Sequence, residues 1–284
     1  HNINTKYTGN TQNSRQKRLY LLHSLHAPKI LAKWIQSKNS SLRKEAIWKS
    51  RSQIAEQTVS TLSKLALDDK AANDDRLNAI AALGAMPPLD NANNLLKRIS
   101  SGKNPLLHAE AQRSLAQREA PKVADYPSLQ DTASWLKKLD ELPGKANPDT
   151  GRRIFFNRKI GTCGNCHQVN ERGIRVGPDL THIGRGTTRE RLLESILDPN
   201  KEVSPYLRPW VITMDDGTIK TGIAMRRGGN TEAYLGIDGK EFRVDKRKIK
   251  SKQELHTSLM PAGLAYTMRP GELRDLVEFL LQQR

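Results

Sequence analysis

The chain has 284 residues, with 47 Lys and Arg against 30 Asp and Glu, and two Cys. Its length suits one to three domains, and 36% hydrophobic residues with a mean hydropathy of −0.66 indicate a polar chain that can still fold. No run approaches the about 18 consecutive apolar residues of a membrane-spanning helix. Two cysteines exclude a disulfide scaffold, a four-cysteine zinc site and an iron–sulfur cluster held by four cysteines.

The formal net charge of +17 is divided between both halves of the chain. Residues 1–147 carry 23 basic and 13 acidic side chains, and residues 148–284 carry 24 and 17. The sequence shows no zinc-finger, RNP-type or basic-zipper pattern, and only four Phe and six Tyr are present for base stacking. A basic surface that attracts an acidic protein partner is therefore favoured, with nucleic acid as the weaker alternative.

Residues 13–120 are expected to form short amphipathic helices with an internal repeat. Similar segments place Ala46, Ala79 and Ala111 in steps of 33 and 32 residues. This period is typical of two-helix solenoid repeats. Turn-forming runs are expected to separate the repeats, at 37–41, 86–88 and 100–105. We predict a HEAT-like helical repeat domain over 1–120, with a generic helical bundle as the alternative.

Residues 121–147 are interpreted as a connector that contains one helix. Its apolar residues fall on one face of that helix, namely Trp135, Leu136, Leu139 and Leu142. Pro143-Gly144 is expected to end it.

Both cysteines belong to the pattern Cys163-Gly164-Asn165-Cys166-His167, the attachment signature of c-type haem. Cysteines three positions apart on one turn can each form a thioether with a haem vinyl group, and His167 then directs its imidazole at the iron. A thioredoxin-like redox pair would lie near a βαβ pattern, whereas helix and loop are expected here. A zinc site would need a fourth ligand from elsewhere. The sequence predicts one covalently bound haem c, with iron held by His167.

The segment Gly177-Pro178-Asp179-Leu180-Thr181 follows the motif. A metal-ligating histidine usually donates its second ring N–H to a fixed acceptor, and we expect the backbone carbonyl of Pro178 to take this role. Leu180 is expected to pack on the haem face. The alternative is an ordinary turn followed by a core leucine. A capping-box pattern at Thr187–Glu190 then predicts a helix with inward residues Leu192, Leu193, Ile196 and Leu197.

The residues alone leave the sixth iron ligand open. Met260 lies in Ser258-Leu259-Met260-Pro261, a short loop before the last expected helix. A thioether at that position would complete a His/Met iron, which raises the reduction potential. A lone Met is more often a core residue. Other side chains compete on chemistry alone, namely Met214, Met225, Met268, His182 and His256.

Between about 204 and 250 the pattern changes from helical to alternating. Asp215-Asp216-Gly217 is a hairpin signal, and Gly228-Gly229-Asn230 and Asp238-Gly239 mark two further turns. The pattern predicts a small antiparallel β insert of about four strands.

These motifs together resemble the planctomycete–verrucomicrobial type of haem-binding c-type cytochrome domain, over about 148–284. The motifs occur in order: Gly151–Phe156, Cys163–His167, Gly177–Leu180, Glu194–Pro199, Asp216-Gly217 and Ser258–Pro261. The resemblance implies a class I cytochrome c fold with His167 and Met260 as axial ligands and thioethers from Cys163 and Cys166. Arg269 departs from the family pattern, which has Ser or Thr before Pro270. The expected fold class is mainly α, with the repeat domain followed by this cytochrome and its β insert.

We expect a monohaem cytochrome that passes single electrons and is not itself an enzyme. In longer chains of this type the cytochrome often follows helical repeats and a β-propeller dehydrogenase, so a partner or upstream dehydrogenase is the expected donor. The chain opens at His1 and is expected to be a piece of a longer protein. The resemblance implies a periplasmic or other extracytoplasmic location. The alternatives are a haem-based ligand sensor and a repeat scaffold that binds acidic partners.

Overall fold

A computed structural model describes residues 28–51, 55–157 and 159–284. The chain divides into two compact units, one ending at Ala120 and the other spanning Pro121–Arg284. The segment 121–147, interpreted above as a connector, is part of the second unit. In this described part of the chain, no helix is long and apolar enough to cross a membrane.

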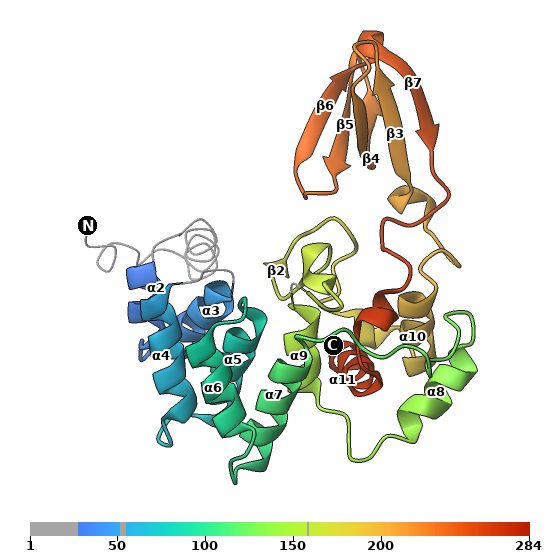
Figure 1. Ribbon diagram of the computed structural model, residues 1–284. Helices are drawn as coiled ribbons and strands as arrows, with labels where there is room; N and C mark the ends of the chain where they lie inside the picture. The colour runs from blue at the N-terminus through green and yellow to red at the C-terminus, as the bar shows by residue number, and fades with distance from the viewer. Residues whose placement is uncertain (1–27, 52–54, 158) are drawn as a thin grey trace. The chain divides into compact units, whose positions relative to one another are not determined.

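The first unit consists of paired helices in two layers (Figure 1). Its helices are α2 (Pro28–Ile35), α3 (Ser40–Ser50), α4 (Glu56–Leu67), α5 (Asn73–Ala85), α6 (Asp90–Ile99) and α7 (Pro105–Ala116). The pairs are α2–α3, α4–α5 and α6–α7. The first helix of each pair contacts the first helix of the next pair, so α2, α4 and α6 form one layer. The second helices, α3, α5 and α7, contact one another in the same way and form the other layer.

The repeated alanines occupy the second helix of each pair. Ala46, Ala79 and Ala111 lie on α3, α5 and α7, and each is 0% exposed. The turn-forming runs are less regular than expected. Only 86–88 separates two pairs, whereas 37–41 and 100–105 connect the helices within a pair. Turn residues end any helix, so they do not distinguish a bend within a repeat from the boundary between repeats.

The helices of the second unit are α8 (Thr132–Asp140), α9 (Pro148–Phe155), α10 (Arg189–Leu197) and α11 (Pro270–Leu281). The unit also contains short 3-10 turns: η1 (Cys163–Asn165), η2 (Ile183–Arg185), η3 (Pro205–Leu207), η4 (Lys246–Lys248) and η5 (Leu264–Thr267). α11 packs closely on α9 at Gly151, where a Cβ atom would overlap the carbonyl oxygen of Asp275. Asn147 donates its backbone N–H to Asp275 Oδ1 at 2.8 Å, which fixes the start of α9 against α11.

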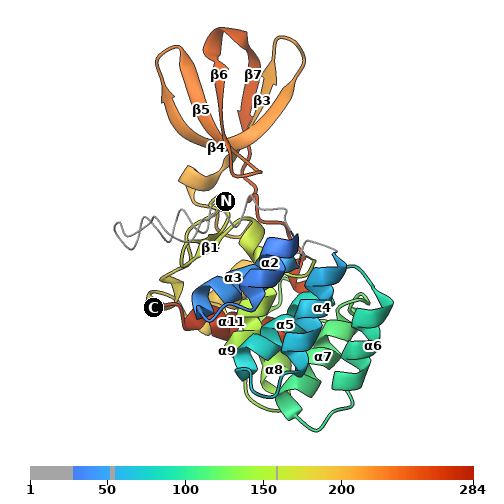
Figure 2. The same cartoon turned by 90° about the vertical axis from the view of Figure 1, so that its left-hand side faces the viewer.

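Two antiparallel sheets lie in the same unit. β1 (Gln168–Val169) and β2 (Arg172–Gly173) form a hairpin. The larger, strongly curved sheet has the order β6-β5-β4-β3-β7 (Figure 2). Its strands are β3 (Pro209–Met214), β4 (Ile219–Gly228), β5 (Thr231–Gly236), β6 (Glu241–Asp245) and β7 (Ile249–Glu254).

The β insert is thus larger than expected. It has five strands where about four were predicted, and its last strand pairs with β3 and extends to Glu254. Ile212 and Tyr234 are completely buried at its centre, so the sheet has a core of its own. The expected fold class of mainly α is therefore wrong in its emphasis, because helices and a substantial sheet together form a mixed fold.

The segment before α9 packs on the end of the chain. Trp135 on α8 is 0% exposed, and its ring lies 5.4 Å from that of Tyr126 and 6.5 Å from that of Tyr266. The Tyr126 hydroxyl donates to the Met268 carbonyl at 3.1 Å, and burial raises the pKa of this phenol. The segment is consequently an integral part of the second unit.

Candidate functional site

The Cys-x-x-Cys-His segment forms a tight turn. Gly161 and Thr162 precede it in the left-handed region, with φ of 61° and 51°. The Cys163 carbonyl accepts the N–H of Cys166 at 3.1 Å and the N–H of His167 at 2.8 Å. Because Thr162 is not a glycine, its left-handed backbone is an unfavourable conformation that the surrounding contacts must hold.

The imidazole of His167 is fixed from two sides. Its Nδ1 lies 2.8 Å from the carbonyl oxygen of Pro178, which assigns the proton to Nδ1 and leaves Nε2 for a metal. Gly177 lies directly against the ring, since a Cβ atom there would be 2.6 Å from Cε1. Burial lowers the pKa of His167, and the bond to Pro178 opposes this in part. His167 is therefore neutral at pH 7, the form that binds metal ions.

The two cysteines are free thiols. Burial raises the pKa of Cys163 to about 12, and burial also raises the pKa of Cys166. Both side chains are protonated at pH 7, which is unlike the low-pKa thiolate of a thioredoxin-type pair. The segment contains η1 and is followed directly by the short β1–β2 hairpin, so it does not belong to a βαβ unit. These features argue against a dithiol redox site.

A cavity of about 230 Å³ opens beside the turn. It brings together four of the site residues predicted from the sequence, namely Cys166, His167, Pro178 and Met260. The other lining residues are Val176, Gly177, Arg191, Glu194, Ser195, Asp198, Pro199, Lys201, Glu202, Leu207, Ile223, Ser258 and Leu259. Cys163 and Leu180, both half-buried, are not among them, so the role predicted for Leu180 stays a prediction.

Met260 is the methionine that lines this cavity. Met214 lies in the sheet core, Met225 is 59% exposed, and Met268 is buried beside Gly161. His182 and His256 are exposed and do not line the cavity. Of the six competing side chains, Met260 is thus the one placed in the same cavity as His167.

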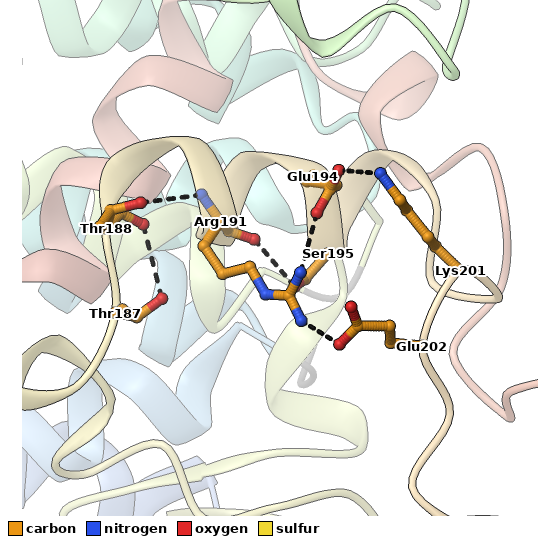
Figure 3. Close-up of polar contacts among 7 residues, drawn as sticks. All are labelled: Thr187, Thr188, Arg191, Glu194, Ser195, Lys201 and Glu202. Atoms are coloured by element: carbon orange, nitrogen blue, oxygen red, sulfur yellow. Dashed lines mark hydrogen bonds and ion pairs between the residues drawn. The ribbon is translucent and has the colours of Figure 1, made fainter.

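The rim of the cavity carries an ion-pair cluster that the sequence analysis did not identify (Figure 3). Arg191 on α10 donates from Nη1 to Glu194 at 3.1 Å and also pairs with Glu202. Lys201 pairs with the second oxygen of Glu194. The spacing of Arg191 and Glu194 is a recognisable helical signal, but no local pattern indicates that Glu202 and Lys201 turn back to α10.

A second missed residue caps the last helix. Arg269 lacks the hydroxyl expected at this position, but its backbone N–H donates to Glu272 Oε2 at 2.8 Å. Glu272 lies in the first turn of α11, where a carboxylate also interacts favourably with the helix dipole. The reciprocal half of a capping box therefore compensates for the absent Ser or Thr.

A zinc ion would need ligands beyond the turn itself. Among the residues with described positions, no group of three or more His, Cys, Asp and Glu side chains is arranged to hold a metal ion.

Comparison of the chain with protein-family models and with curated proteins gives no match.

Proposed function

We propose that the second unit, 121–284, binds one covalent haem c and acts as a single-electron carrier. One observation carries this proposal: the cavity beside the Cys-x-x-Cys-His turn is also lined by Met260, from a loop far away in the sequence. A fixed, neutral histidine and a thioether facing one cavity are the donor set of a His/Met haem iron. This supports the class I cytochrome c fold that the sequence resemblance implies.

The residues of the cavity fit such a group. His167 presents Nε2 because Nδ1 is bound to the Pro178 carbonyl. Cys166 lines the cavity, and Cys163 lies three residues before it at the start of η1; these are the two thiols that would add across the vinyl groups. The apolar part of the wall is supplied by Val176, Pro178, Pro199, Leu207, Ile223 and Leu259.

When bound, haem c accepts and releases one electron at its iron. The protein contributes orientation and exclusion of water. Ile223 on β4 is 7% exposed, and with Leu207 it brings the β insert into the cavity wall. The β5–β6 turn also lies against this wall, because a Cβ atom at Gly239 would overlap Ile174, two residues before Val176. The apolar part of the wall would favour the less charged, reduced iron and so would raise the reduction potential.

Covalent attachment tests the proposal. The chain is expressed with a haem-maturation system, and the purified protein is stained for haem after denaturing electrophoresis and weighed by intact mass spectrometry. We expect the mass of one haem on the wild type. The Cys163→Ala/Cys166→Ala variant should carry none, and the control Met225→Ala should match the wild type. A wild-type protein without covalent haem would refute the proposal.

The expected partner is an acidic redox protein, and the segment that connects the two edge strands of the β insert, β6 and β7, is strongly basic. Residues 240–252 contain seven basic and two acidic side chains, so they supply a net +5 of the +7 carried by 148–284. Arg247 and Lys240 expose more than four-fifths of their side chains, and Lys248 and Lys250 are also exposed. A poly-glutamate probe should bind the full chain with an affinity that falls steeply with salt. Lys248→Glu/Lys250→Glu should weaken it more than the charge-matched Lys64→Glu/Lys97→Glu.

On this proposal, any dehydrogenase activity would belong to a partner protein or to an upstream domain. Covalent haem attachment in this family takes place outside the cytoplasm, which supports a periplasmic or equivalent location. The stacked helix pairs of the first unit are consistent with HEAT-like repeats, which commonly bind other proteins.

A further inference from the structure

The turn that follows α10 has a defined conformation. α10 ends at Leu197, and Asp198 Oδ1 accepts the N–H of Asn200 at 3.3 Å. The N–H of Lys201 donates to the Asp198 carbonyl at 3.2 Å. These two bonds close the turn that carries Asn200.

The ion-pair cluster ties the same turn to α10 (Figure 3). Lys201 pairs with Glu194, and Glu202 pairs with Arg191, which also contacts Glu194. A single exposed ion pair of this kind contributes little to stability. Here, however, two ion pairs, Lys201–Glu194 and Glu202–Arg191, join the segment 198–202 to the helix. The contact between Arg191 and Glu194 links these two pairs to each other.

Asn200 extends this connection to the loop that carries Met260. Its Oδ1 accepts the backbone N–H of Ser258 at 2.8 Å. Ser258 Oγ in turn accepts the backbone N–H of Met260 at 3.0 Å. Ser258 and Met260 both line the cavity, as do Glu194 and Lys201. A continuous set of polar contacts thus runs from α10 to the methionine backbone.

We infer that Asn200 and Ser258 are positioning residues for the Met260 thioether. This inference rests on the proposed haem function, and it concerns how the chain holds the distal ligand. A loop already held in the ligating conformation loses less conformational entropy when the sulfur binds. The two hydrogen bonds therefore strengthen Met260 against exogenous ligands that compete for the same coordination position.

Imidazole competition with the oxidised holoprotein measures this effect. The readout is the loss of the long-wavelength sulfur-to-iron charge-transfer band as imidazole is added. Asn200→Ala and Ser258→Ala should each bind imidazole about fivefold more tightly, the equivalent of one ordinary intramolecular hydrogen bond. Asn200→Asp and Ser258→Thr keep the oxygen acceptor and should retain wild-type affinity. The control Asn230→Ala changes an exposed turn of the sheet and should have no effect.

Hydrogen–deuterium exchange of the chain without haem supplies an independent readout. The Met260 amide should exchange about fivefold faster in Ser258→Ala than in the wild type. Unchanged imidazole affinity in both alanine variants, or equal affinity in the alanine and conservative variants, would overturn the inference. If the wild type carries haem and shows the sulfur-to-iron band, such a result refutes only the positioning role. A wild type without covalent haem refutes the proposed function and this inference together.

Discussion

Replacement of Gly177 by Ala should displace the ring of His167. The added Cβ atom would lie 2.6 Å from Cε1, 2.9 Å from Nδ1 and 3.1 Å from Nε2, all shorter than ordinary van der Waals contact. The ring must move by about 1 Å, because carbon atoms in contact are about 3.5–4.0 Å apart. Overpacking of this kind costs about 1–3 kcal/mol. Distortion of the 2.8 Å bond to the Pro178 carbonyl adds about 1 kcal/mol.

The free energy of unfolding should therefore fall by about 2–4 kcal/mol in Gly177→Ala. For a unit of this size the expected decrease in Tm is about 4–16 °C, followed by far-UV circular dichroism. Gly271→Ala is the matched control, since a Cβ atom there meets nothing within 4 Å and lies in α11. The control should be neutral or stabilised by up to about 1 kcal/mol. Equal stability of the two variants would refute the close contact between Gly177 and the ring.

Three further predictions concern single side chains. Met260→Ala should abolish the sulfur-to-iron charge-transfer band of the oxidised holoprotein, and persistence of the band would identify another ligand. Arg274 donates to the carbonyls of Leu142 and Gly144 at 3.1 Å each, so Arg274→Ala should increase proteolysis at 142–145 while Arg284→Ala does not. Burial opposes ionisation of Glu232, but hydrogen bonds from Lys252 and Tyr234 outweigh this effect and lower the pKa of the carboxyl. The ionised Glu232 therefore stabilises the fold above its unfolded pKa, and this contribution is lost as the pH falls below about 4.5. In Glu232→Gln the Tm should therefore fall less between neutral and acid pH than in the wild type. The same loss of Tm in both proteins would contradict the stabilising role of the Glu232 carboxylate.

The local part of the site could be predicted from the sequence. Cys163, Cys166 and His167 lie within five consecutive residues. A single turn brings them together whatever the rest of the fold is. The acceptor for His167 follows eleven residues later in the Gly177–Thr181 segment, and the Pro178 carbonyl lies where the sequence suggested. The alanine period likewise depends on local helix geometry, and the three alanines occupy equivalent buried positions.

Contacts between distant segments could not be predicted in this way. Ile223 lies on β4, opposite Pro209 of β3, and it lines the cavity only because the whole β insert packs there. The bond between Asn200 and Ser258 joins residues whose separation carries no periodic signal. The cap of the last helix could not be predicted from Arg269 either, because the contact that supplies it comes from the carboxylate of Glu272, three residues later.

A potentiometric titration of the purified holoprotein, followed by its reduced-minus-oxidised visible spectrum, tests the central claim most directly. The account predicts one reversible one-electron transition with the sharp bands of a low-spin c-type haem. It also predicts that carbon monoxide does not bind the reduced protein at neutral pH, because Met260 would already be bound to the iron. A protein that shows no haem spectrum, or one whose reduced form binds carbon monoxide readily, would contradict a His167/Met260 electron carrier.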